Sequence, residues 1–218
     1  WLESAPSPGR GRAKSREEIV SVITPAASVL LTRGPESREL FAILRGQHLK
    51  FFGGFWAFPG GKLGTDDSEN ADHAAARRIA ACRELFEETG ILIARNSQGV
   101  FPLSSPDLDE CRRALLAEQL PFARMLAERG LRIRADDFSL IGEITTPNFA
   151  PVRYATTFFV CDSPAGQQPN VWPGELERGE WIDGSGLLRR WQTGEILLTP
   201  PSVMTLQTLA GNAVSNAP

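Results

Sequence analysis

The chain has 218 residues, of which 42% are hydrophobic and 22% are charged. These fractions are close to the averages of globular proteins, so they argue against a disordered or fibrous chain, and the length suits one domain, or one with insertions. The 23 basic and 26 acidic residues leave a net charge of −3, which argues against nucleic-acid binding through a strongly basic surface.

Cysteine content and hydropathy bear on the location of the protein. Cys82, Cys111 and Cys161 are far apart and odd in number, which is typical of neither a disulfide framework nor a zinc site. No apolar run approaches the roughly 18 residues that a membrane-spanning helix needs. We therefore expect a cytoplasmic protein that does not bind membranes. Because residue 1 is Trp, we also expect that the chain was processed or cut from a longer one, which could contain an additional domain.

Composition divides the chain into three parts. Residues 1–18 are polar and rich in Pro, Gly and Arg, and they predict a flexible leader or linker. Residues 19–212 predict a single domain, and residues 213–218 a tail. Within the domain, residues 103–130 predict a helical insertion that is interrupted at Pro121.

Strand patterns occupy the first part of the predicted domain. Apolar runs at 23–32 and 40–44 predict two strands that form a hairpin. The aromatic, glycine-rich segment 51–58 follows and leads into Pro59-Gly60-Gly61. Glycine permits close approach of the backbone to a ligand, so this loop is the first candidate for a functional site.

The remaining elements lie on the C-terminal side of the insertion. Residues 138–146 and 154–161 predict two paired strands, and residues 180–183 predict a short third strand. Residues 187–193 and 201–209 predict helices. This order of strands and helices is compatible with an α/β protein.

The strongest helical pattern covers residues 70–89 and carries three acidic side chains. At about 100° per residue, Glu84, Glu87 and Glu88 share an arc of about 100°. The apolar side chains lie on the opposite side of this helix: Ala75, Ile79, Cys82 and Phe86. Because clustered carboxylates repel one another, they predict a bound cation such as Mg²⁺, which prefers carboxylate and phosphate oxygens. The alternative is an acidic helix face in solvent.

Two segments resemble the signature of the Nudix hydrolases. The first is Phe58-Pro59-Gly60-Gly61-Lys62, and the second is Arg83-Glu84-Leu85-Phe86-Glu87-Glu88-Thr89-Gly90-Ile91, which matches the family pattern throughout. Gly61 and Arg83 are 22 positions apart where the family pattern has 14, so eight residues are inserted. The first acid of the pattern is therefore displaced, and Asp67 and Glu69 are candidates for its role.

The resemblance implies a fold, a cofactor and roles for several residues. The implied fold is the Nudix α/β/α sandwich with a mixed β-sheet, here with a helical insertion. The implied cofactor is Mg²⁺ or Mn²⁺, with four ligand positions: Glu84, Glu87, Glu88 and the backbone at Gly61. Arg83 would orient a carboxylate, and either Glu84 or a loop acid would act as general base. Of the loop acids Glu175 and Glu177, Glu175 is preferred.

A longer resemblance, from Ile19 to Ala210, is to the coenzyme A diphosphatase-like branch with an enlarged Nudix box. It is carried by Gly54-Phe55-Trp56-Ala57-Phe58, Thr146-Pro147 and Leu197-Leu198-Thr199-Pro200-Pro201. The implied activity is divalent-metal-dependent hydrolysis of a diphosphate bond in a nucleoside diphosphate linked to another moiety, with coenzyme A or acyl-CoA preferred.

Arginines and aromatic residues are the candidate substrate contacts. Arg33 and Arg45 could bind phosphates, and Phe55 and Trp56 could form a shelf for the base, together with Phe51 and Phe52. Core packing is the alternative for the aromatic cluster. Alternative substrates are ADP-ribose, NADH and dinucleotide polyphosphates, and an alternative function is a non-catalytic nucleotide-binding Nudix domain of a longer protein. A homodimer is a further expectation.

Overall fold

The structure is a computed structural model that describes residues 22–34, 39–67 and 72–215. The leader predicted at 1–18 and the candidate acid Glu69 lie outside these ranges. The last helix continues to Ser215, into the segment 213–218 that was expected to be a tail.

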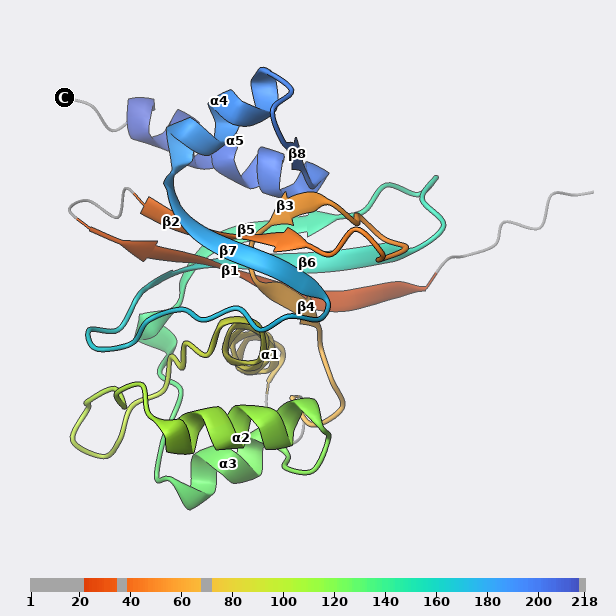
Figure 1. Cartoon of the computed structure of the whole chain (residues 1–218). Helices are drawn as coiled ribbons and strands as arrows, with labels where there is room; N and C mark the ends of the chain where they lie inside the picture. The colour runs from red at the N-terminus through yellow and green to blue at the C-terminus, as the bar shows by residue number, and fades with distance from the viewer. Residues whose placement is uncertain (1–21, 35–38, 68–71, 216–218) are drawn as a thin grey trace, which may run out of the picture.

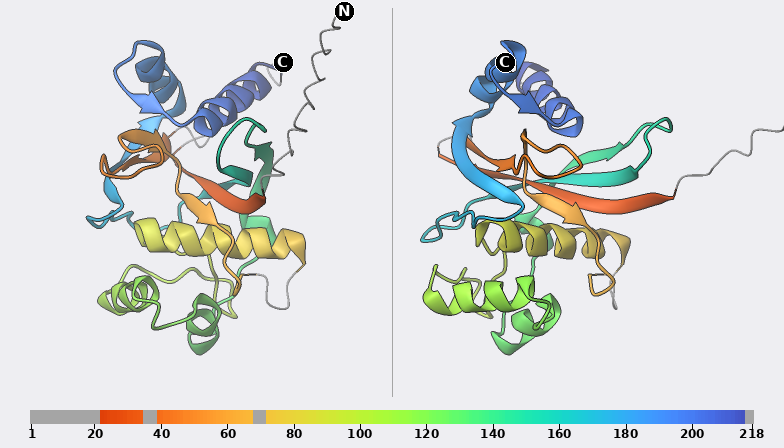
Figure 2. Two further views of the ribbon diagram at one scale, coloured as in Figure 1. Left: turned by 90° about the vertical axis from the view of Figure 1, so that its right-hand side faces the viewer. Right: turned by 45° about the vertical axis from the view of Figure 1, so that its right-hand side comes forward.

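The described residues form three layers with a mixed sheet in the middle (Figure 1). Helix α1 (His73–Thr89) lies against one face of the sheet, and α4 (Gly184–Gln192) and α5 (Pro200–Ser215) cover the other. Helices α2 (Pro106–Leu116) and α3 (Phe122–Glu128) lie beyond α1, as the further views also show (Figure 2). The predicted α/β/α sandwich with a helical insertion is therefore confirmed.

The sheet combines long central strands with short ones near the glycine loop. Its strands are β1 (Ile23–Arg33), β2 (Glu39–Arg45), β3 (Phe55–Ala57), β4 (Gly60–Lys62), β5 (Ser139–Thr145), β6 (Arg153–Asp162), β7 (Leu176–Asp183) and β8 (Leu197–Leu198). Their order is β5-β6-β1-β2-β3-β8, with β4 paired to β1 and β7 paired to β2. Parallel pairing joins β1 to β6 and β3 to β8, and the other pairs are antiparallel.

The longer predicted elements agree with these bounds. The predicted hairpin of β1 and β2 and the predicted pairing of β5 with β6 are confirmed. Pro121 precedes α3, where the insertion was expected to break. The sequence analysis did not predict β3, β4 or β8, because strands of two or three residues are too short to show a period of two. The strand predicted at 180–183 is the end of β7.

Two hydrophobic clusters hold the layers together. Alternate residues of β1 point to opposite faces of the sheet, so Val29 and Leu31 belong to the cluster under α1, and Leu30 belongs to the cluster under α4 and α5. Leu85 and Phe86 of α1 are fully buried in the first cluster. This packing determines which face of α1 meets the sheet.

Local sequence defines both ends of α1. The Asp72 carboxylate accepts a hydrogen bond from the Ala75 N–H at 2.6 Å and caps the N-terminus, so the described helix begins at His73. Gly90 ends it with φ 76°, a left-handed conformation that glycine adopts without a steric penalty, and donates its N–H to the Phe86 carbonyl.

Candidate active site

A cavity of about 480 Å³ lies between the acidic face of α1 and the sheet. Strands β1, β4 and β6 and the start of α5 contribute to its walls. The residues that line the cavity include several that the sequence analysis selected for the site: Arg45, Phe51, Phe52, Gly61, Glu84, Glu88 and Glu175. Residues more than 100 positions apart therefore meet at one site.

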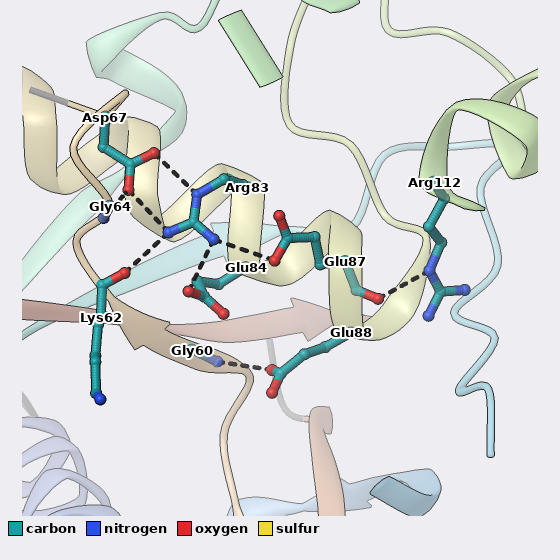
Figure 3. Close-up of polar contacts among 9 residues, drawn as sticks. All are labelled: Gly60, Lys62, Gly64, Asp67, Arg83, Glu84, Glu87, Glu88 and Arg112. Carbon is teal, nitrogen blue, oxygen red and sulfur yellow. Dashed lines mark hydrogen bonds and ion pairs between the residues drawn. The ribbon is translucent and has the colours of Figure 1, made fainter. Parts of the chain in front are cut away.

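Glu84 and Glu88 lie one turn apart on α1 and face this cavity. The Glu88 carboxylate accepts the Gly60 N–H at 2.8 Å (Figure 3). Burial raises the pKa of Glu88 well above its ordinary value, and repulsion from Glu84 raises it further. Burial likewise raises the pKa of Glu84 to about 7, because attraction by Arg83 compensates only in part. A bound cation would therefore stabilise the charged form of both carboxyl groups.

Gly61 permits a close approach between β4 and α1. A Cβ atom at this position would lie 2.5 Å from the carboxylate of Glu84, closer than real Cβ contacts allow. Gly60 is confined in the same way, since a Cβ there would lie 2.4 Å from the carbonyl oxygen of Ala27. The glycine pair thus lets the loop pass directly beside the acids.

Arg83 is the centre of a charge network on the other side of Glu84 (Figure 3). Its guanidinium donates to both carboxylate oxygens of Asp67, to Glu84 at 2.9 Å and to Glu87 at 3.1 Å. It also donates to the Lys62 carbonyl at 2.9 Å. Although burial alone would lower it, the hydrogen bond with Asp67 raises the pKa of Arg83, so the side chain stays cationic. Arg83 therefore contacts three carboxylates, and its role in orienting one of them for catalysis stays a prediction.

Asp67 occupies the position that the displaced first acid of the signature would have when counted from Gly61. Its side chain is 1% exposed and pairs with Arg83. The contact with the signature arginine is therefore present although Gly61 and Arg83 are 22 positions apart where the family pattern has 14.

Glu87 was expected to be a metal ligand beside Glu84 and Glu88. In the structure its carboxylate contacts Arg83, and it is absent from the residues that line the cavity. Burial raises its pKa, and attraction by Arg83 opposes the shift. Glu87 thus belongs to the charge network, and Glu84 lies between the network and the cavity.

Arg45 and Glu175 approach the cavity from the opposite side. Among the described residues, the buried Nε of Arg45 has no hydrogen-bond partner. The positive charge of Arg45 lowers the pKa of Glu88, whereas the negative charge of Glu175 raises it. Glu175 is exposed and its carbonyl accepts the Gly46 N–H at 2.8 Å, which joins the two segments. Glu177 instead accepts the Gln47 N–H at 3.0 Å and does not line the cavity.

Three of the predicted substrate contacts lie outside the cavity lining. Arg33 pairs with Glu39 and lies 4.3 Å over the ring of Trp181 at the far end of β1. Trp56 is 3% exposed and packs in the hydrophobic cluster under α4 and α5. Phe55 is half-buried and contacts the ring of Phe52 at 5.2 Å. For Trp56 the structure therefore shows core packing, the alternative given above for the aromatic cluster.

Phe51, Phe52 and Tyr154 are the aromatic side chains at the cavity that could take the role of a shelf. Phe51 contacts the rings of both others, at 5.0 Å and 6.5 Å. Tyr154 was missed by the sequence analysis. It alternates with Thr156 and Phe158 along β6, a period of two that indicates a common face, but the sequence does not show that this face borders the cavity.

The donor set was tested for a divalent metal. Within the described ranges, no group of three His, Cys, Asp or Glu side chains could hold a metal ion by itself. Mg²⁺ usually keeps several waters and binds through one or two carboxylates together with substrate phosphates. Glu84 and Glu88, both half-buried beside one cavity, fit this mode of binding.

The layered fold, the glycine loop and the acidic helix define a Nudix hydrolase. The family model described as NUDT19 Nudix domain matches residues 65–209, and the chain belongs to this family. The chain is also 28% identical over 196 residues to a Caenorhabditis elegans protein assigned as nudix hydrolase 7. The match covers 88% of this chain but only 62% of that protein's length.

Solved structures agree with this assignment. The fold is similar to that of a NUDIX hydrolase from Alicyclobacillus acidocaldarius, with a TM-score of 0.76 and 27% identity over 86% of this chain and 91% of that one. The NUDIX domain of Shewanella oneidensis NrtR, solved with ADP ribose, has a TM-score of 0.52 at 9% identity over 90% of this chain and 92% of that one. This second likeness concerns the fold alone. None of the helices in the described ranges combines the length and apolar character of a membrane-spanning segment.

Proposed function

We propose that the chain is a divalent-metal-dependent diphosphatase that cleaves a nucleoside diphosphate linked to another moiety, with coenzyme A or acyl-CoA preferred. The observation that carries this proposal is that Glu84 and Glu88 face Arg45 across one cavity behind the glycine loop. Acidic and basic groups on opposite sides suit a substrate whose diphosphate must contact both a metal ion and a cation.

The proposal gives roles to the acidic residues, the glycine loop and the arginine at the cavity. Glu84 and Glu88, with the backbone at Gly61, would hold Mg²⁺ or Mn²⁺, which would supply charge neutralisation of the diphosphate and activation of water. Arg45 would donate to a phosphate oxygen through its unpartnered Nε.

A general base must accept a proton from the attacking water. Glu84 and Glu175 are the two candidates, because both border the cavity. In the metal-free protein burial raises the pKa of Glu84 to about 7, and a metal ion held by the same carboxylate would lower it. Arg83 would keep Glu84 oriented through its hydrogen bond at 2.9 Å.

The preference for coenzyme A rests on the sequence resemblance and on the aromatic side chains at the cavity. Phe51, Phe52 and Tyr154 could pack against an adenine ring or a pantetheine arm, and Lys62 lies 5.9 Å from the Tyr154 ring. A cytoplasmic location, a homodimer and an additional domain in a longer chain stay predictions of the sequence.

A panel of substrates tests the proposal. Coenzyme A, ADP-ribose, NADH and diadenosine polyphosphates are incubated with Mg²⁺ or Mn²⁺, with a chelator and with the Glu88→Gln variant, and the products are resolved by mass. We expect water to cleave coenzyme A into 4′-phosphopantetheine and 3′,5′-ADP, with turnover reduced at least about 100-fold in the variant. Faster cleavage of another panel member would refute the substrate preference.

The same experiment separates catalysis from binding alone. If no substrate is cleaved, yet Mn²⁺ raises the melting temperature of the wild-type protein and not of Glu88→Gln, the chain is a non-catalytic nucleotide-binding domain. Hydrolysis that persists in the presence of the chelator would contradict the metal requirement.

A further inference from the structure

Arg112 is a buried arginine on helix α2 of the insertion. Its side chain is 1% exposed, and it is the largest of the fully buried side chains. Burial lowers its pKa to about 10, so it remains cationic at neutral pH. Among the described residues, its hydrogen bonds go to backbone carbonyls of two other segments and not to a carboxylate.

These bonds join three segments at the end of α1. Arg112 donates Nε to the carbonyl of Glu87 at 2.9 Å and Nη1 to the carbonyl of Asn170 at 2.7 Å (Figure 3 shows the first contact). Asn170 in turn donates its N–H to the carbonyl of Thr89 at 2.8 Å. The guanidinium also lies 4.0 Å over the ring of Trp172. Arg112 and Asn170 together satisfy carbonyls that the helix end leaves without intrahelical partners.

The position of these contacts relates them to the cavity. Glu88 follows Glu87 directly, so a bond to the Glu87 carbonyl holds the turn that carries the Glu88 side chain. Asn170 and Trp172 belong to the segment that leads to Glu175 at the opposite wall. A cation is also favourable at the C-terminus of a helix, where the peptide dipoles present negative charge.

We propose that Arg112 is a positioning residue for the active site, which sets the distance between the α1 acids and the wall that carries Glu175. The proposal rests on the proposed function, because that function makes Glu88 a metal ligand and Glu175 a candidate general base. A buried cation is costly to desolvate, and an apolar side chain in its place would leave the carbonyls of Glu87 and Asn170 without this donor. The test must therefore separate loss of stability from loss of positioning.

The test compares Arg112→Met, which removes the charge and both hydrogen bonds, with Arg112→Lys, which keeps the charge. Met125→Ala is the matched control, because Met125 is 1% exposed on α3 of the insertion and truncating it creates a cavity without removing a hydrogen bond to α1. All variants are assayed at a temperature at which each is folded. The readouts are kcat and KM, the dissociation constant of Mn²⁺, and hydrogen exchange of residues 86–90 and 163–175.

We expect Arg112→Met to lower kcat and to weaken Mn²⁺ binding by about 10- to 100-fold, as is typical when groups that orient metal ligands are lost. Hydrogen exchange should accelerate in residues 86–90 and 163–175. Arg112→Lys should recover part of each loss. Met125→Ala should lower the melting temperature and leave kcat and Mn²⁺ binding within about twofold of wild type.

Other outcomes are equally decisive. Wild-type kcat, Mn²⁺ affinity and exchange in a folded Arg112→Met variant would overturn the proposal, and so would equal losses in Met125→Ala. If Arg112→Met does not fold, the Arg112→Lys variant decides. Wild-type kcat, Mn²⁺ affinity and exchange in that variant would show that a positive charge is enough and that the two hydrogen bonds of the arginine are not needed, which would overturn the proposal. If the wild-type protein cleaves no substrate, the proposed function fails, and Mn²⁺ affinity and exchange still decide the role of Arg112.

Discussion

Asp67 and Arg83 form a two-point ion pair, with Nε donating to Oδ1 at 2.9 Å and Nη2 to Oδ2 at 2.8 Å. Asp67 also accepts the Gly64 N–H at 2.7 Å. The side chains are 1% and 16% exposed, so water screens this pair far less than it screens a surface pair. The pair keeps Arg83 beside Glu84 although Gly61 and Arg83 are 22 positions apart where the family pattern has 14.

Replacing Asp67 should therefore destabilise the protein. Asp67→Asn removes one carboxylate from a buried guanidinium and should lower the free energy of unfolding by about 2 to 3 kcal/mol, measured by urea denaturation. Asp66→Asn is the control, because Asp66 is exposed and hydrogen-bonds only to its neighbour Thr65 in the described structure, and it should stay within about 0.5 kcal/mol of wild type. Equal losses in the two variants would contradict the importance of the pair.

The stability of the metal-free protein should fall as the pH rises from about 4.5 to about 7. Burial raises the pKa of Glu84 from 4.5 to about 7, so the folded state binds more protons than the unfolded state in this window. The stabilisation from the protonated carboxyl is complete below the unfolded pKa and is lost as the pH passes the folded pKa, by roughly 3 kcal/mol. Glu88, whose pKa is raised by burial, contributes with the same sign.

Urea denaturation between pH 4.5 and 8 in the presence of a chelator measures the slope of the free energy of unfolding against pH. Glu84→Gln should flatten it, because the amide does not titrate. A wild-type protein that becomes more stable from pH 5 to 7, or a variant with an unchanged slope, would be inconsistent with burial of the Glu84 carboxyl.

Arg45 and Arg33 should differ sharply in their effect on substrate binding. Arg45→Met removes a cation at the cavity whose Nε lacks a partner, and KM should rise about 10- to 100-fold, the value of one or two charge-assisted hydrogen bonds. Arg33→Met changes an arginine that pairs with Glu39 outside the cavity, so KM should change less than about twofold. Steady-state kinetics on the best substrate decide between them, and a large effect at Arg33 would restore it as a substrate contact.

Gly61→Ala should impair activity more than stability. The added Cβ would lie 2.5 Å from the Glu84 carboxylate, which can move because it is the end of a flexible side chain. The free energy of unfolding should change by less than about 1 kcal/mol, whereas kcat should fall about 100-fold because a catalytic carboxylate is displaced. Gly142→Ala, with nothing within 4 Å of its Cβ, is the control. Normal turnover in Gly61→Ala would show that catalysis does not depend on the position of the Glu84 carboxylate.

Local patterns determined much of the fold before tertiary structure entered. The hairpin of β1 and β2, helix α1 with its stop at Gly90, and the break at Pro121 follow from periods of two and 3.6 residues and from glycine and proline chemistry. The signature also placed Glu84 and Glu88 on one face of α1, because spacing along a helix is a local property.

Contacts between distant segments could not be obtained in this way. Pairing of β1 with β6 brings Tyr154 to the cavity, and the burial of Trp56 under α4 removes it from the site. Arg33 and Arg45 lie near the two ends of the same hairpin and have similar sequence surroundings, yet Arg45 alone reaches Glu88. Side-chain type and period do not encode which face meets which neighbour.

The sequence by itself determined the family, the acidic helix and the glycine loop, because each depends on residues close together in the chain. Tertiary structure alone decided that Asp67 pairs with Arg83, that Glu87 does not line the cavity, and that Arg112 donates to a carbonyl at the end of α1. These three relationships depend on burial and on hydrogen-bond geometry between segments, which arise only when the layers pack.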